Sequence, residues 1–340
     1  MTAQLPGRRQ IVETLSRFRQ RRPRLAAALL AFDASVYCVL WILLMLAPVW
    51  MKIPLAAAAA LAIARLFVLG HDACHGSYFD SAWANAVLGR MAFLPSLTPF
   101  STWELGHNTL HHGFTNLRGK DYGYTPFSKT EFDALPAWRR GLERAYRHPL
   151  GPGLFYAADI WWRRLWFPRG ANARPVHQLD SALVAAFALA QIAAAWRIAG
   201  WTGQNPWAVT GWGLAAPFAV WKCLMGFVTV MHHTSPATVW YAHRRDWDPA
   251  AAQLENSVHI VFPAWFSAAL GNIMDHTAHH LDSRIPLFAL PAAQLAVEEM
   301  FPERVIAQPW SLGYYLDCCR RCKLYDYDRR RWLGFDGEPS

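Results

Sequence analysis

The amino-acid sequence predicts an all-α integral membrane protein with four transmembrane helices, arranged as two hairpins and joined to a cytoplasmic helical cap. Two observations predict this fold class. Four long apolar runs interrupt otherwise polar regions, and arginine concentrates on one side of those runs. The hydrophobic content of 54% and the 18 tryptophans agree with it, because Trp is enriched where helices meet the membrane interface. Three short histidine clusters further predict that the cap holds a His-rich site for two metal ions.

The four apolar runs are long enough to cross a bilayer. About 20 apolar residues span the ~30 Å hydrocarbon core, and the only charge in the first run is Asp33. The links between the first and second runs and between the third and fourth are short, which predicts two helical hairpins. The expected spans cover residues of about 25–48, 53–70, 181–201 and 207–231.

The positions of the basic residues predict the topology. An even number of spans places both termini on one side, and the segments on that side carry nearly all the Lys and Arg, whereas the opposite loops carry only Lys52. By the positive-inside rule, both termini are cytoplasmic, and the composition suggests a bacterial inner membrane. We therefore expect a basic cytoplasmic arm at 1–24 and one membrane domain at 25–340, whose cap is formed by 71–180 and 232–340. Since this bias explains the net charge of +9, no nucleic-acid partner is expected.

Eight of the 14 histidines fall in three clusters, all predicted on the cytoplasmic side. If the second cluster is α-helical, His107 and His111 share one face, and His112 lies about 100° further round, where it can reach a second ion. Side chains this close together at helical spacing predict metal binding. The cluster members are His71 and His75; His107, His111 and His112; and His276, His279 and His280.

The remaining histidines carry weaker signals. His233 directly follows the fourth span and is the expected ninth ligand, with its neighbour His232 as the alternative. The other four stand alone in the sequence, so we interpret them as ordinary surface or core residues: His148, His177, His243 and His259.

The number of imidazoles indicates the kind of site. Half of them would saturate one four-coordinate zinc ion, whereas eight or nine neutral imidazoles suit two transition-metal ions, each five- or six-coordinate. Acids within or beside the clusters could accept the free ring N–H and so fix the orientation of the ligands. These acids are Asp72, Glu104, Asp121 and Asp275.

A metal transporter or sensor is the alternative function. Transporters bind their ions near the bilayer midplane, whereas these clusters lie at or beyond the span ends.

The clusters resemble the three histidine boxes of the integral-membrane fatty acid desaturase family. The segments HNTLHHGFTNLRGKDY, starting at His107, and GNIMDHTAHH, starting at Gly271, are similar to those of its acyl-lipid ω6/Δ12 branch, and the resemblance covers roughly residues 25–300. It implies two iron ions held by the nine histidines, with Asp72, Asp121, Asn272 and Asp275 around them.

The resemblance also implies the reaction. O2 is the co-substrate, and a cis double bond is introduced into an acyl chain carried by a membrane lipid or a thioester. The sequence contains no flavin fingerprint and no ferredoxin cysteine run, so an external electron donor such as a ferredoxin or a cytochrome b5-like protein is expected. Related hydroxylases, acetylenases and carotenoid ketolases remain alternatives.

Overall fold

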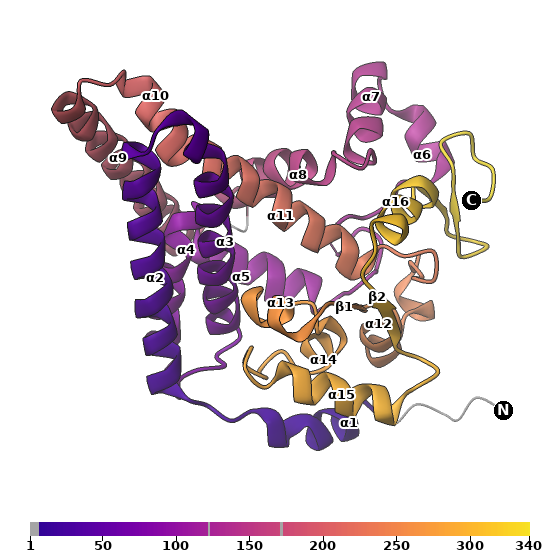
Figure 1. Cartoon of the computed structure of the whole chain (residues 1–340). Helices are drawn as coiled ribbons and strands as arrows, with labels where there is room; N and C mark the ends of the chain where they lie inside the picture. The colour runs from indigo at the N-terminus through magenta and orange to yellow at the C-terminus, as the bar shows by residue number, and fades with distance from the viewer. Residues whose placement is uncertain (1–6, 122, 171–172) are drawn as a thin grey trace. The chain divides into compact units, whose positions relative to one another are not determined.

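A computed structural model describes residues 7–121, 123–170 and 173–340, and the chain is predominantly helical (Figure 1). The first six residues of the expected basic arm, and Tyr122 of the second motif, lie outside the described residues. The chain divides into two compact units, which are described separately. Unit 1 consists of Met1–Gln20, Leu105–Phe155 and Gly226–Ser340, and unit 2 of Arg21–Glu104 and Tyr156–Met225.

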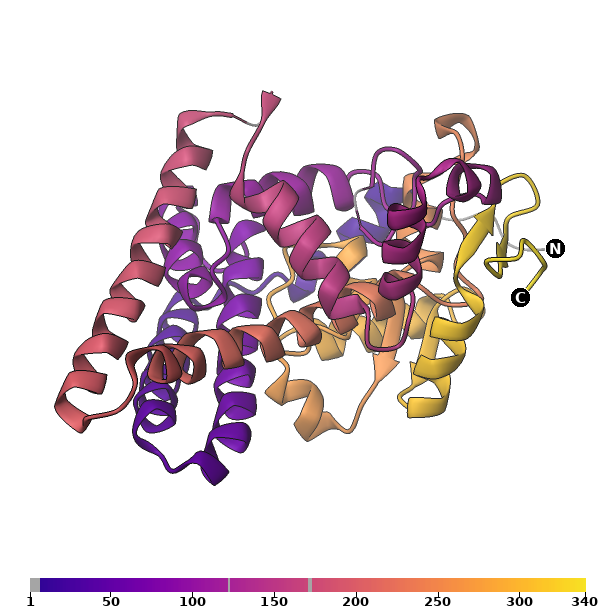
Figure 2. The same cartoon turned by 90° about the horizontal axis from the view of Figure 1, so that it is seen from above.

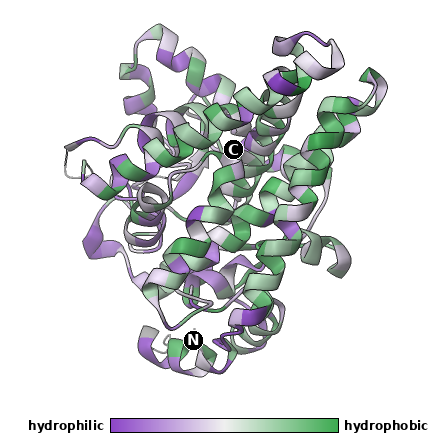
Figure 3. Ribbon diagram, turned by 90° about the vertical axis from the view of Figure 1, so that its left-hand side faces the viewer, coloured by the Kyte–Doolittle hydropathy of each residue, from purple (hydrophilic) through white to green (hydrophobic). Residues whose placement is uncertain are grey.

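Four helices are long and apolar enough to cross a membrane, as the sequence predicted. They are Pro23–Leu46 (α2), Val49–Cys74 (α3), Pro175–Thr202 (α9) and Pro206–His233. The last is a continuous run of α10 (Pro206–Thr210), the π-helical η6 (Gly211–Ala215) and α11 (Ala216–His233). Figure 2 shows α9 turning at its C-terminal end into α10, and Figure 3 shows how hydrophobic residues dominate these helices.

The predicted boundaries were off by one to six residues. The first helix ends at Leu46 rather than near 48, because Ala47 and Pro48 adopt extended backbone. The second was expected to end at Gly70 but continues to Cys74, and the chain leaves it at Gly76, whose φ of +69° is left-handed. His71 of the first histidine cluster is therefore part of the spanning helix itself, and His75 follows directly as its C-cap residue.

Within unit 2, an ion pair fixes the position of α2 against α3. The carboxylate of Asp33 on α2 accepts hydrogen bonds from Arg65 on α3 at 2.7 and 3.2 Å, and the Asp33 side chain is only 3% exposed. Removing one partner of such a buried pair typically costs about 3–5 kcal/mol, because the other charge is left without compensation. The pair therefore specifies how the two helices are aligned more than it adds stability.

Close packing fixes the end of α3 against α4 (Ala82–Phe93), again within unit 2. Gly70 lies against the ring of Phe93, which a Cβ atom at this position would overlap. Phe93 in turn stacks on Phe67, with ring centroids 4.6 Å apart. Shorter helices complete this unit: α5 (Phe100–Glu104) and the π-helical η4 (Tyr156–Trp166).

Unit 1 is built from short helices and two small sheets that the all-α prediction did not include. The parallel sheet pairs β1 (Val258–Val261) with β2 (Ile306–Pro309), and the antiparallel sheet pairs β3 (Leu324–Asp326) with β4 (Arg331–Leu333). The helices are α1 (Arg8–Leu15), α6 (Lys129–Ala134), α7 (Ala137–Tyr146), α8 (Pro152–Phe155), α12 (Pro249–Glu255), α13 (Ala264–Ala269), α14 (His276–Leu281), α15 (Leu290–Met300) and α16 (Leu312–Arg321).

The described part of the basic arm is not a free segment. Helix α1 buries Ile11 and Leu15 in a core that also contains Ala278 and Leu281 of α14. Arg19, just beyond α1, donates to Asp282 at 2.6 Å. The arm thus supports the back of the helix that carries the third histidine cluster.

Candidate metal centre

In unit 2, the first cluster lies at the C-terminal end of α3. His71 belongs to the last turn of the helix, and His75 is its C-cap residue; their ring centroids are 5.0 Å apart. The Asp72 carboxylate lies 3.0 Å from Nδ1 of His71 and also accepts a hydrogen bond from Tyr78. A carboxylate on Nδ1 fixes the ring and leaves Nε2 as the nitrogen that can bind a metal.

In unit 1, the second cluster forms a π-helical turn, η3 (Leu105–His111), rather than an α-helix. The N–H of His112 donates to the carbonyl of His107 at 2.9 Å, which is the i→i+5 bond of a π-helix. As a result His107 and His112 lie together, with their Nε2 atoms 3.1 Å apart, whereas His111 belongs to a different group. The expectation that His107 and His111 share a face was wrong, because it assumed α-helical spacing.

Seven of the eight box and span-end histidines of unit 1 form two groups. In the first, Nε2 of His112 lies 3.1 Å from Nε2 of His107 and 3.1 Å from Nε2 of His279. In the second, Nε2 of His233 lies 3.0 Å from Nε2 of His276. The second group also contains His111 and His280, and all its candidate ligand atoms lie within 4.8 Å of one another. Helix α14 contributes to both groups, since His276 and His280 share a face and His279 does not.

The spacing of the Nε2 atoms fits metal ions with more than four ligands. Two nitrogens bound at about 2.1 Å are about 3.0 Å apart when they subtend a right angle at the ion, and about 3.4 Å apart when the angle is tetrahedral. The three measured separations are 3.0 to 3.1 Å. In addition, Nε2 of His280 is buried without a hydrogen-bond partner in the described part of the chain. The residues present therefore fit octahedral or related coordination.

The charge state of the third cluster also suits metal binding. Burial, together with the neighbouring imidazoles, lowers the pKa of His276 and of His280 well below the ordinary value. Both rings are consequently neutral at pH 7, and the neutral imidazole is the form that coordinates a metal.

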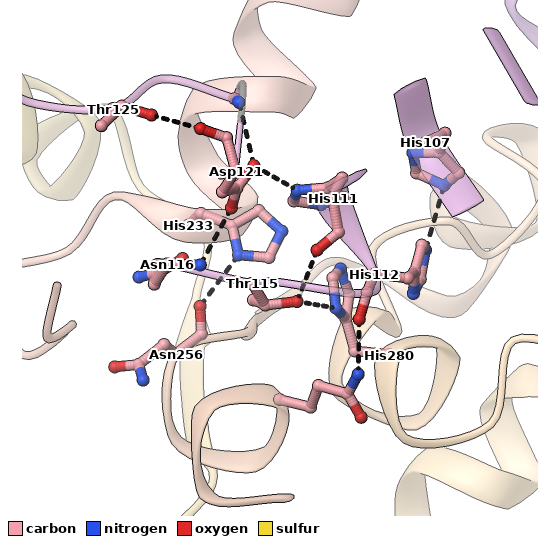
Figure 4. Close-up of polar contacts among 12 residues, drawn as sticks. His107, His111, His112, Thr115, Asn116, Asp121, Thr125, His233, Asn256 and His280 are labelled. Carbon is pink, nitrogen blue, oxygen red and sulfur yellow. Dashed lines mark hydrogen bonds and ion pairs between the residues drawn. The ribbon is translucent and has the colours of Figure 1, made fainter. Parts of the chain in front are cut away.

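Oxygen atoms behind the second group fix three of its four rings (Figure 4). Asp121 lies 3.0 Å from Nδ1 of His111, the Asn256 carbonyl 3.0 Å from Nδ1 of His233, and the Thr115 hydroxyl 3.3 Å from Nδ1 of His280. In all three cases Nδ1 is occupied and Nε2 is the nitrogen left to face the group.

The carboxylate of Asp121 is held in its ionised form. Burial opposes ionisation, but the charge and hydrogen bond of His111 and the N–H of Gly123 outweigh it and lower the pKa of Asp121. Its second oxygen accepts a hydrogen bond from the Asn116 N–H at 2.9 Å. Asp121 is thus a fixed anion behind His111.

The comparisons with known proteins agree with this geometry. The profile of the family described as Fatty acid desaturase matches residues 48–311, which is most of the chain. The chain belongs to the fatty acid desaturase family. Family membership and the four apolar helices together make it an integral membrane protein.

Individual relatives span much of the same region. The sn-1 oleoyl-lipid 12-desaturase of Picosynechococcus sp. is 30% identical over 94% of this chain and 90% of that protein. The enzyme of the same name from Synechocystis sp. is 30% identical over 78% of this chain and 73% of that protein. The chloroplastic omega-6 fatty acid desaturase of Glycine max is 28% identical over 85% of this chain but only 64% of the plant protein.

Three residues expected to contact the histidines of this desaturase-family site have other surroundings. The side chain of Asn272 donates to the Leu287 carbonyl, and Asp275 contacts His259 rather than a box histidine. Glu104 is exposed at the end of α5. Conversely, sequence reasoning missed Thr115 and Asn256, for which the sequence carries no signal because they meet their histidines only in the folded chain.

The two span-end histidines of the desaturase-family chain have different surroundings. His233 belongs to the second group, whereas His232 stacks on His276 with ring centroids 3.5 Å apart and has Nε2 3.3 Å from the sulfur of Met274. Only His233 therefore offers a nitrogen to the group.

Adjacent substitutions at the end of α11 test this difference. We expect His233→Ala to reduce the metal bound per purified chain by about half, because one of the two groups loses a ligand. His232→Ala, the matched control, should retain nearly full metal content, because His232 does not belong to either group of candidate ligands. Elemental analysis of the two detergent-purified variants measures this, and the opposite order would show that His232 is the ligand.

An insertion tests the π-helical turn. Thr109 is exposed within η3, so Thr109→Ala should be harmless. Inserting one alanine after Thr109 should place His111 and His112 five and six positions after His107, so that His112 no longer lies beside His107. We expect the insertion variant to lose most of its bound metal while keeping its helical circular dichroism. Metal content equal to that of Thr109→Ala would contradict the sorting of these histidines by the π-turn.

Proposed function

We propose that this chain is an O2-dependent acyl-lipid desaturase that introduces a cis double bond at the Δ12 (ω6) position of an oleoyl group. The observation that carries the proposal is the convergence of buried imidazole nitrogens into two groups in a chain of the fatty acid desaturase family. The names of the relatives support the position, because two of them are described as oleoyl-lipid 12-desaturases.

The proposed centre holds two iron ions. His107, His112 and His279 would bind one, and His111, His233, His276 and His280 would bind the other. The proposed set of iron ligands also includes His71 and His75. Asp72 and Asp121 orient His71 and His111, as their contacts support, and we retain Asn272 and Asp275 as residues that shape the surroundings. When bound, such an iron pair activates O2 for removing hydrogen from unactivated carbons, which no side chain can do alone.

The protein's own contribution is positioning and exclusion of water. The Nδ1 contacts hold the rings of His71, His111, His233 and His280 in one tautomer and one orientation, so that these ligand nitrogens need not reorganise during the reaction. The histidines of the third cluster are almost fully buried, His279 completely so. A dry site protects the chain being desaturated from side reactions with water.

The reaction also requires an external reductant. Removing two hydrogens from the acyl chain while O2 is reduced to two waters consumes two electrons and two protons. Neither flavin nor ferredoxin motifs occur in the sequence, so we propose a separate donor, a ferredoxin or a cytochrome b5-like protein. The net charge of +9 favours an acidic one.

We further propose that α2–α3 and α9–α11 are two membrane hairpins, that residues 25–340 form one domain, and that both termini and the histidine cap are cytoplasmic, in a bacterial inner membrane. The distribution of arginine supports this orientation. Reporters after Ser340 and near Ala137 should give a cytoplasmic signal, and one near Gln204 an outer signal. An outer signal at Ala137 would refute the four-span topology.

The product tests the reaction itself. We expect a host that contains oleate but no linoleate to accumulate linoleoyl lipid when it expresses the chain together with a donor, and mass spectrometry of the total lipids measures this. His280→Ala is the matched inactive control. A hydroxylated, acetylenic or keto product would keep the metal centre but replace the desaturase assignment. Metal uptake without O2 consumption would instead favour a transporter or sensor.

A further inference from the structure

The helix that carries the third histidine cluster cannot fix its own position. α14 has only six residues, His276–Leu281, and helices this short are marginal unless tertiary contacts hold them. Its first N–H groups also have no partner within the helix. Because it supplies one histidine to the first group and two to the second, its placement governs both.

Asp275 occupies the N-cap position of α14 but does not cap it. An Asp at this position ordinarily accepts a hydrogen bond from the first turn, yet its side chain bonds no backbone N–H of the helix. Instead one oxygen lies 3.1 Å from Nε2 of His259. Asp275 is only 7% exposed, and its other oxygen has no partner among the described residues. Asp275 therefore contacts His259, a histidine that stands alone in the sequence, instead of capping the helix.

Both ring nitrogens of His259 have a carboxylate partner. It lies on β1 between the core residues Val258 and Ile260, so its side chain leaves the strand on the opposite face. Its Nδ1 lies 2.5 Å from the carboxylate of Glu298 on α15. Burial alone would lower its pKa, but the hydrogen bonds and charges of Asp275 and Glu298 outweigh it and raise the pKa of His259. A doubly protonated ring donates to both carboxylates.

These contacts form a closed hydrogen-bonded ring of residues, which runs from Asp275 to Ala278. The oxygen of Glu298 that faces His259 also accepts from the side-chain N–H of Gln294, at 2.9 Å. The side-chain oxygen of Gln294 accepts from the Ala278 N–H in the first turn of α14, at 2.8 Å. The path therefore leaves α14 at Asp275 and returns to it at Ala278, through two side chains of α15 and one of β1.

We propose that His259 and Glu298 are positioning residues of the metal centre. The hydrogen-bonded ring from Asp275 to Ala278 fixes the first turn of α14. It thereby sets the direction of His276, His279 and His280. This inference rests on the proposed metal centre but not on the identity of the product. It assigns a role to two residues on different elements that touch no histidine of either group in the described contacts.

The test compares neighbouring glutamates on α15 in the full-length, metal-loaded protein. Glu298→Ala opens the ring, whereas Glu298→Gln keeps an oxygen that accepts from both His259 and Gln294. Glu299→Ala is the matched control, because Glu299 is exposed and follows directly on the same helix. Two quantities are measured: the rate at which a chelator removes the metal, and hydrogen–deuterium exchange of the peptide that contains residues 276–281.

We expect Glu298→Ala to release metal about 10-fold faster and to exchange faster across α14, with Glu298→Gln and Glu299→Ala within about twofold of the parent. Equal behaviour of Glu298→Ala and Glu299→Ala would overturn the proposal. Glu298→Gln behaving like Glu298→Ala would also overturn it, because charge rather than the hydrogen-bonded ring would then be responsible.

If Glu298→Ala does not accumulate, Gln294→Met opens the other half of the ring with little change of volume. It must show the same faster release and exchange, and parent-like values would overturn the proposal. Neither readout uses the acyl product. A wrong desaturase assignment would therefore show up in the lipid analysis and leave this test unaffected.

Discussion

The constraint on which unit 1 depends is that a buried imidazole must find a partner for both ring nitrogens. A buried polar atom left without one costs about 1–3 kcal/mol, and the second group alone contains four histidines. For three of them, oxygens of Asp121, Thr115 and the Asn256 carbonyl lie within reach of Nδ1. The Nε2 atoms converge on one another instead, so an ion would satisfy them, and metal binding would stabilise the fold.

Two elements with different backbone geometry each carry three histidines, and each element divides its three histidines between the two groups. In α14 the i,i+4 pair His276 and His280 goes to one group, and His279 goes to the other. In η3 the π-helical turn pairs residues five apart, so His107 and His112 go together and His111 separates. An α-helix at η3 would direct His111 toward the wrong group. The extra residue in this turn therefore has a functional consequence.

The sequence predicted the four apolar helices and the histidine clusters because both are local patterns: length and hydropathy in one case, spacing in the other. What it could not predict depends on contacts between distant segments. Nothing near Ile11 and Leu15 indicates that they pack against α14, and nothing near His259 indicates Asp275 and Glu298. The π-turn was missed for a related reason, since GHNTLHH is equally compatible with an α-helix and its backbone is set by packing around it.

In unit 2 the position of the first cluster follows from charges far from it. His71 lies six residues beyond Arg65 on the same helix, so whatever fixes Arg65 along the axis also fixes His71. A slip of one turn would move α3 by about 5.4 Å and leave Asp33 buried without its partner. Because residue 70 is glycine, the Phe93 ring can approach α3 more closely than any side chain at this position would allow. An ion pair and a glycine contact, neither part of the metal centre, thus determine where α3 delivers its histidines.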